Sequence, residues 1–132
     1  MGGGGDRGSM KRKIKIIVGK LELEAWLNES RTATVVFEAL PITSTLNTWG
    51  DEIYFTIPVD AKPEDAKELA SLGDIGYWPP GKAMCVFFGR TPISRGDEIR
   101  PASPVNIIGK VEDDLKLLKK VKDGEEITVR PV

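Results

Sequence analysis

The chain has 132 residues, and its 19 lysines and arginines nearly balance its 20 aspartates and glutamates. It contains no histidine, which excludes Ser–His and Cys–His nucleophile pairs, imidazole general bases and histidine-ligated zinc. The balanced charge gives no electrostatic case for nucleic acid, and the lone Cys85 excludes a disulfide framework and a thiolate metal cluster. We therefore expect no cofactor and no nucleic-acid partner.

The first residues differ from the rest of the chain. Residues 1–9 have no apolar periodicity, so we expect a disordered expression leader there and a single domain over residues 10–132. No secretory segment and no long apolar run occurs. This pattern predicts a cytoplasmic protein with no membrane partner.

Alternating apolar and polar residues predict a hairpin at the start of the domain. The alternation runs over residues 13–18 and again over residues 21–27, and it is typical of half-buried strands. Gly19 and Lys20 lie between the two segments, and glycine at the first central position favours a type II′ turn.

Two segments have helical spacing instead. The first is a short helix over about residues 33–40, with Ser30 or Thr32 as its N-cap and Pro41 after its end. The second is expected at about residues 113–121, with acidic residues at its start and lysines at its end. Its apolar stripe consists of Leu115, Leu118 and Val121.

The remaining alternating segments predict further strands, at residues 43–49, 52–58, 75–78, 83–88, 104–111 and 127–130. Residues 83–88 are apolar on both faces, which indicates a central strand covered on each side. Residues 60–72 fit either a short helix or an ordered loop, and residues 89–104 are expected to form a long exposed loop. About eight short strands with two capping α-helices favour a closed β-barrel, which leaves no strand edge unpaired.

Several motifs carry a family resemblance. Residues 14–41 resemble the opening of cyclophilins, and residues 105–112, VNIIGKVE, resemble the cyclophilin strand before the second helix. Longer motifs are similar to the cyclophilin-like proteins of bacteria and archaea, a group of largely unassigned function, at residues 47–55, 73–83, 87–92 and 101–106. The resemblance implies a mainly β, closed cyclophilin-like barrel.

The same resemblance implies that the isomerase site is altered. The segment that matches the catalytic strand of cyclophilins has no arginine and no glutamine, and Asn47 stands where the arginine is expected. Residues 100–104 replace the tryptophan and histidine of the pocket wall, and only Phe87 or Phe88 could stand in for the pocket phenylalanine of the isomerases. We therefore expect no efficient prolyl isomerase.

The candidate ligand-binding residues are Asn47, Trp49, Tyr54, Tyr77, Trp78, Phe88, Arg90, Arg100 and Ser103. Each has an alternative role: the aromatic residues could fill the barrel, and the arginines could be surface charges paired with Asp97 or Glu98. Cys85 is expected to be a buried structural thiol.

Three hypotheses about function follow. The first is a binding module for a small molecule or an extended peptide. The second is a weak peptidyl-prolyl isomerase that uses Arg90 or Arg100. The third is carboxylate chemistry at Glu52 or Asp74, within an amide-processing enzyme complex that supplies a protein partner.

Overall fold

The computed structural model describes residues 11–132, so the leader predicted over residues 1–9 lies outside the described part. These residues form nine strands: β1 (Arg12–Val18), β2 (Leu21–Leu27), β3 (Ile42–Thr45), β4 (Asn47–Thr48), β5 (Glu52–Thr56), β6 (Asp74–Trp78), β7 (Ala83–Phe87), β8 (Asn106–Val111) and β9 (Glu126–Pro131). They also form the α-helix α2 (Arg31–Glu38) and two 3-10 helices, η1 (Pro79–Gly81) and η2 (Leu115–Lys120).

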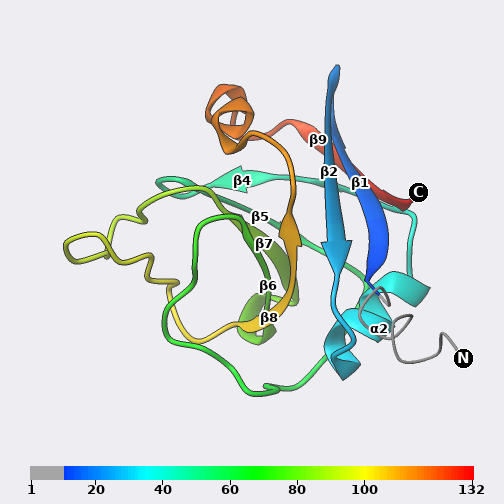
Figure 1. Ribbon diagram of the computed structural model, residues 1–132, viewed down its shortest axis with the longest axis horizontal. Helices are drawn as coiled ribbons and strands as arrows, with labels where there is room; N and C mark the ends of the chain where they lie inside the picture. Colours follow the sequence, from blue (N-terminus) through cyan, green and yellow to red (C-terminus); the bar gives the residue numbers. More distant parts are fainter. Residues whose placement is uncertain (1–10) are drawn as a thin grey trace, which may run out of the picture.

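The strands form one antiparallel sheet in the order β3-β9-β1-β2-β8-β6-β7-β5-β4 (Figure 1). The first and last strands of this order, β3 and β4, are separated in the chain only by Leu46. One segment therefore pairs with β9 in its first half and with β5 in its second half, and so it nearly closes the barrel. The single strand predicted over residues 43–49 is split at Leu46, whose N–H donates to Glu125 O.

The barrel interior holds the main core, and the predicted hairpin supplies one of its walls. Ile14 and Ile16 of β1 and Leu23 of β2 are fully buried there. Val18 pairs with Leu21 across the turn, and Gly19 has a φ of 59°, as a type II′ turn requires at its first central position. The hairpin prediction is confirmed.

Strand β7 separates the main core from a second, smaller apolar cluster. Met84 and Val86 point into the barrel, whereas Cys85 and Phe87 point to the outside, where Val105 packs against them. All five residues of β7 are buried, as two-sided apolarity predicts for a central strand. The outer cluster makes one wall of the site described below.

Strand β8 departs from the predicted pattern. Ile75 of β6 pairs with Gly109, but the next residue, Gly76, pairs with Ile107, so Ile108 is an extra residue in a β-bulge. Ile108 is therefore 0% exposed in the main core, while Ile107 packs on the outer cluster. Strict alternation over the strand predicted at residues 104–111 would place Val105 and Ile107 on the inner face with Val111, and this expectation is wrong because the bulge reverses the alternation.

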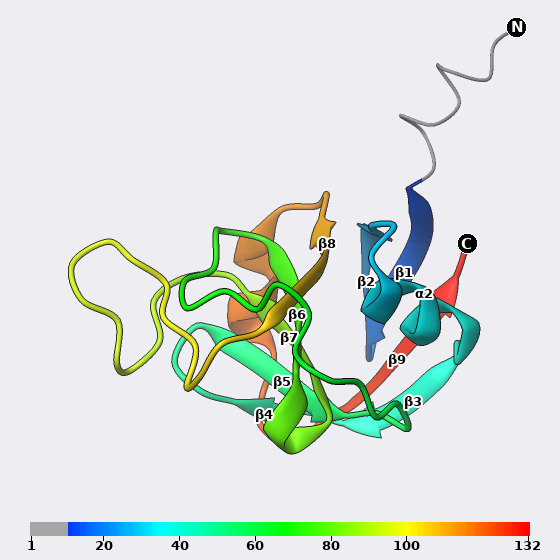
Figure 2. The same ribbon diagram turned by 90° about the horizontal axis from the view of Figure 1, so that it is seen from below.

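Helix α2 covers one end of the barrel (Figure 2). Ser30 is the N-cap, and its hydroxyl accepts a hydrogen bond from Ala33 N at 3.1 Å. Glu64 adds a second cap: its carboxylate accepts hydrogen bonds from the backbone N–H of Arg31 and of Thr32, at 3.1 and 2.8 Å. Residues 60–72, which contain Glu64, form an ordered loop and no helix.

The second predicted α-helix is a 3-10 helix, η2. The apolar residues Leu115, Leu118 and Val121 recur every three residues, which is the repeat of a 3-10 helix and not of an α-helix. Leu118 is buried in the core.

The described part of the chain contains no helix long and apolar enough to span a membrane.

Candidate functional site

A cavity of about 270 Å³ lies on the outer side of the barrel wall. Strand β5 defines that side, because Ile53 and Phe55 point into the main core and Tyr54 points the opposite way. Four structural segments meet at the cavity: the turn before strand β5, strand β5 itself, the end of strand β6, and the end of the long loop before β8. The lining residues are Trp49, Glu52, Tyr54, Trp78, Pro101, Ala102 and Val105.

Trp49 reaches the cavity from the tight turn between β4 and β5. Its backbone N–H donates to the backbone oxygen of Glu52 at 2.9 Å, and the backbone N–H of Glu52 donates to the backbone oxygen of Trp49 at 3.2 Å. Gly50 has a φ of 59°, and a Cβ there would lie 2.8 Å from Pro92 Cδ and 2.9 Å from Arg90 O. Only glycine lets the turn pack this closely on the long loop, so Gly50 holds Trp49 in place.

Trp78 lines the cavity from the end of β6. Its indole Nε1 donates to Ser103 Oγ at 2.6 Å, which ties the ring to the long loop. A Cβ at Gly81 would lie 2.5 Å from Trp78 Cε3, so the ring rests directly on the glycine backbone. Ser103 does not line the cavity, but it positions a residue that does.

Tyr54 and the loop residues complete the apolar part of the lining. Tyr54 pairs with Asn47 on one side and with Cys85 on the other. Pro101 and Val105 are buried, and Val105 forms a β-bridge with Lys67 that anchors this end of the loop. Pro101, Ala102 and Val105 thus form an aliphatic wall of the cavity, in the region where the resemblance to cyclophilins would place aromatic side chains.

Glu52 is the polar group of this lining. The residue is only 6% exposed, and its Oε1 has no hydrogen-bond partner among the described residues. Burial raises the pKa of Glu52 from 4.5 to about 7, and a hydrogen bond with the Cys85 thiol lowers it in part. A buried carboxyl oxygen without a partner is energetically costly, and such groups gather at functional sites.

Cys85 lies beside this carboxyl on β7. Burial, together with the charge of Glu52, raises the pKa of the Cys85 thiol well above its ordinary value. The thiol is therefore protonated at neutral pH and is a poor nucleophile. The prediction that Cys85 is buried is confirmed.

Asn47, Tyr77 and Phe88 are predicted site residues that do not line the cavity. Tyr77 is 0% exposed in the main core, where its hydroxyl donates to Val59 O at 2.6 Å and accepts from Ala61 N at 3.0 Å. Phe88 also packs in the main core and is 6% exposed. Both point into the barrel because they alternate with outward-facing neighbours, so their assignment to the site is corrected.

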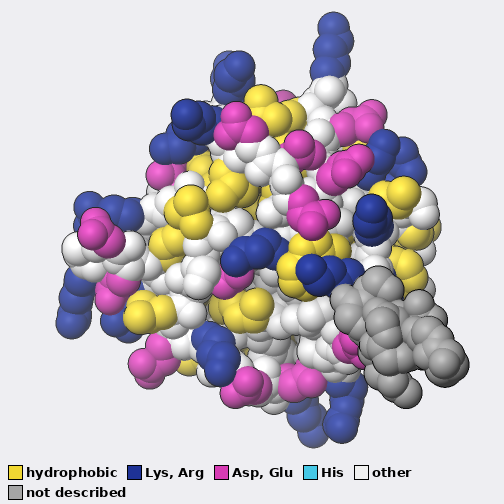
Figure 3. Space-filling model, in the orientation of Figure 1, with side chains coloured by type: hydrophobic (Ala, Val, Ile, Leu, Met, Phe, Trp, Pro, Cys, Tyr) yellow, Lys and Arg dark blue, Asp and Glu magenta, His cyan; other side chains and the backbone are white. Residues whose placement is uncertain are grey.

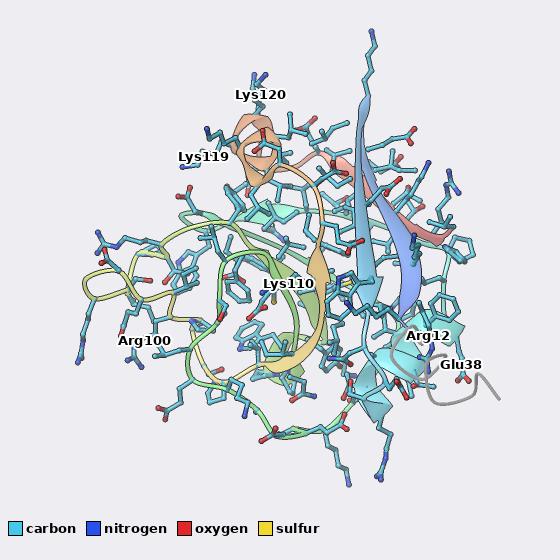
Figure 4. All side chains as sticks on the ribbon, in the orientation of Figure 1. Arg12, Glu38, Arg100, Lys110, Lys119 and Lys120 are labelled. Carbon is cyan, nitrogen blue, oxygen red and sulfur yellow. The ribbon has the colours of Figure 1, made fainter. Side chains whose placement is uncertain are left out.

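The two arginines also lie outside the cavity lining. Figure 4 labels Arg100 on the long loop, where its Nε and a terminal nitrogen donate to the two carboxylate oxygens of Glu98, at 2.7 and 3.2 Å. This hydrogen bond lowers the pKa of Glu98. Arg90 is exposed and donates to Ser94 O at 3.0 Å. Arg100 therefore matches its alternative role as a paired surface charge.

The long loop is more ordered than the sequence suggests. Ser94 and Thr91 are buried, and Ser94 Oγ accepts hydrogen bonds from the backbone N–H of Thr91 and of Arg100, both at 3.0 Å. Ile99 packs in the outer cluster. The loop, predicted to be exposed, is thus partly buried through Thr91, Ser94, Ile99 and Pro101, and its end lines the cavity together with Glu52.

The other acidic candidates have structural partners. Asp74 accepts a hydrogen bond from Ser71 N at 2.7 Å and forms an ion pair with Lys110 at 3.5 Å, near the middle of the face in Figure 4. Asp51 pairs with Lys119 of η2 at 3.5 Å. On the face shown in Figure 3, basic and acidic side chains are interspersed with apolar ones.

A second cavity, of about 310 Å³, lies beside the start of helix α2. Its acidic residue Glu64 caps the helix, and hydrogen bonds from the side chain and backbone of Thr32 hold the pKa of Glu64 below its ordinary value. Asn106 completes this network, donating to Thr32 Oγ1 at 3.1 Å and to Lys62 O at 2.9 Å. These groups are engaged in holding the helix, so the cavity beside Trp49 is the stronger candidate.

Sequence reasoning identified three lining residues, Trp49, Tyr54 and Trp78, together with Ser103 behind them. It omitted Glu52 from the binding residues and considered it only for carboxylate chemistry. One signal was present: Glu52 and Tyr54 share a face of β5, opposite two core residues. The loop that meets this face at the cavity is a long-range feature without a local sequence pattern.

Comparison with known proteins gives a family and a structural relative. A family model described as cyclophilin-like matches residues 12–130. The chain is similar to a hypothetical protein of Archaeoglobus fulgidus, AF2241, whose solution structure is known. The sequence identity is 44% and the TM-score 0.78, over 92% of this chain and 95% of that one. A search of the curated proteins finds no match.

Proposed function

The chain belongs to the cyclophilin-like family, and from that premise we propose that its domain is a binding module without efficient isomerase activity. The occupant is a small molecule, or one side chain of an extended peptide, held between Trp49 and Trp78. The observation that carries the proposal is the lining of the cavity: aromatic rings surround one buried, unpartnered carboxyl oxygen of Glu52. Apolar cavities with few placed polar groups are typical ligand sites.

The positioning of the walls supports the same proposal. Gly50 and Gly81 are glycines whose Cβ would collide with neighbouring atoms, and each fixes one of the two tryptophans. Ser103 adds a hydrogen bond to the Trp78 ring. Rigid aromatic walls reduce the entropy that binding must overcome.

The arrangement does not favour isomerase chemistry. Lowering the barrier to X–Pro rotation, which is about 18–20 kcal/mol, requires donors placed against the twisting imide. Arg100 is held by Glu98, and Arg90 donates to the long loop. Neither arginine is among the described residues that line the cavity.

Nuclear magnetic resonance of the indole N–H groups tests the binding proposal. The chain has three tryptophans, of which Trp49 and Trp78 line the cavity, whereas Trp26 on β2 packs against Lys11, 4.4 Å from its ring. Titration with a fragment library should shift the first two signals and leave Trp26 as an internal reference. If no fragment shifts Trp49 or Trp78 selectively, the binding proposal is wrong.

The absence of efficient isomerase activity has its own test. Exchange spectroscopy on an X–Pro peptide should show no acceleration of cis–trans exchange at high protein concentration. A clear acceleration would contradict this part of the proposal. Replacing Arg90 and Arg100 with alanine would then show whether either residue is responsible.

A further inference from the structure

The charge at the cavity has one sign. Among the described residues that line it, Glu52 is the ionisable acid, and the others are Trp49, Tyr54, Trp78, Pro101, Ala102 and Val105, none of which is cationic. The nearby Arg100 is neutralised by Glu98, and the nearby Asp51 is paired with Lys119. A ligand therefore meets a carboxyl group without a compensating cation.

The buried oxygen of Glu52 requires a hydrogen-bond donor. Oε1 has no partner among the described residues, and leaving such an acceptor buried is unfavourable, more so when the group is charged. A neutral or anionic acceptor would leave this cost in place. An N–H donor that carries positive charge would remove it and neutralise the carboxylate as well.

The aromatic residues favour the same kind of ligand. Indole and phenol rings attract cations through their quadrupoles, and aromatic residues that surround an ammonium group are a recurring recognition device. The cavity holds three such rings, from Trp49, Tyr54 and Trp78. Its volume, about 270 Å³, lies just below the usual range for ligand pockets, which suits a compact head group and not a large ring system.

We infer that the cavity takes an alkylammonium group that carries at least one N–H, with its alkyl part against the three rings and its N–H donated to Glu52 Oε1. This inference rests on the proposed binding function and names its ligand class. The head group can belong to a free amine or to a lysine side chain of an extended peptide, which share this chemistry.

Proton linkage adds an independent readout. Burial raises the pKa of Glu52 to about 7, so the carboxyl is protonated in mild acid and ionised above neutrality. The titratable groups that face it are the Cys85 thiol on β7 and the Tyr54 phenol on its own strand. Since the thiol stays protonated near neutral pH, Glu52 is the group whose charge changes, and cation binding should release its proton.

The test compares three probes of similar size by titration of the indole signals. N,N-dimethylethanolamine is a protonated amine with one N–H, choline is a cation without N–H, and 3,3-dimethyl-1-butanol is neutral. We expect affinity to fall in that order, with the protonated amine at least about tenfold tighter than the alcohol at about pH 8. Its affinity should weaken by about tenfold or more at about pH 5.5, while the alcohol shows no such change.

The variant Glu52→Gln keeps the shape of the side chain and removes its charge. It should lower the affinity for the protonated amine about tenfold at about pH 8 and abolish the pH dependence, without changing the affinity for the alcohol. Glu24→Gln is the matched control, since Glu24 is exposed on strand β2 and lies outside the lining, and it should change neither. Far-ultraviolet circular dichroism verifies that each variant is folded.

The two sources of the head group are separated by peptides. A short extended peptide with a central lysine is compared with its norleucine counterpart and with the free amine. Tighter binding of the lysine peptide than of the free amine assigns a peptide ligand, and the reverse assigns a free amine. If the neutral alcohol binds as tightly as the amine, the inference fails while the binding function stands. If fragments of every class leave Trp49 and Trp78 unshifted, both fail.

Discussion

Replacing Glu52 with glutamine should change how the stability of the protein depends on pH. The carboxyl is 6% exposed, and its Oε1 has no partner among the described residues. Burial raises its pKa from 4.5 to about 7. Because the folded-state pKa lies above the unfolded one, the stability that protonated Glu52 contributes is fully present below pH 4.5 and is lost as the pH rises through about 7.

The size of the effect follows from the same values. A pKa that rises from 4.5 to about 7, at about 1.4 kcal/mol for each pKa unit, makes the ionised carboxylate cost the folded state about 3 kcal/mol. Glutamine cannot ionise, so the folded state of the variant does not lose this free energy as the pH rises. The free energy of unfolding of Glu52→Gln, minus that of the natural protein, should therefore rise by about 3 kcal/mol between pH 4.5 and about pH 8.

Denaturant unfolding at a series of pH values measures this difference. The subtraction cancels the titration of the other carboxylates, and a constant offset from the new amide group does not affect the slope. Glu24→Gln, which likewise removes one carboxylate but from an exposed position on β2, serves as the control for the loss of a single negative charge. Parallel pH profiles for the natural protein and Glu52→Gln would refute the account of a buried carboxyl.

Three further predictions concern the supports of the site and the fold. Gly50→Ala should lower the free energy of unfolding by about 2 kcal/mol in denaturant titrations, because φ is 59° and the new Cβ would meet Pro92 Cδ at 2.8 Å. Cys85 should resist a thiol reagent in the native protein and react on unfolding, followed by absorbance, because burial raises its pKa. Glu64→Gln should lower the free energy of unfolding by about 0.5 kcal/mol near neutral pH. The ionised carboxylate of this half-exposed helix cap has a lowered pKa in the fold, so it stabilises the folded state above pH 4.5. The last difference should vanish in unfolding experiments as the pH falls through the folded-state pKa.

Local patterns predicted the parts of the fold that depend on local physics. Alternation in β1 and β2 and the glycine turn between them need no information from the rest of the chain, and both are confirmed. The end of helix α2 before Pro41 and its capping by Ser30 are local in the same sense. These features follow from backbone geometry and side-chain period alone.

The errors arose where distant segments set the local structure. The bulge at Ile108 depends on how β8 pairs with β6, and it reverses the faces of Val105 and Ile107. Helix η2 is a case in which the signal was present, because a three-residue apolar spacing indicates a 3-10 helix. Tyr77 was assigned to the site although the period of its strand points it into the barrel.

The candidate site was predicted in part for the same reason. Trp49 and Trp78 are next to turns, so their position at a rim is a local property. Glu52 shares the cavity with Pro101 and Ala102, at the end of the loop over residues 89–104, whose fold depends on Ser94 and Ile99. The combination of aromatic rings and a buried acid could therefore be recognised only once the loop had been placed.

The central claim is that the cavity between Trp49 and Trp78 is a binding site. The most direct measurement is a crystal structure of the protein soaked with the fragment library at a pH above neutrality. The account predicts density for a bound fragment between the two indole rings, with a donor within hydrogen-bond distance of Glu52 Oε1. A cavity that stays empty while fragments bind elsewhere on the surface would contradict it.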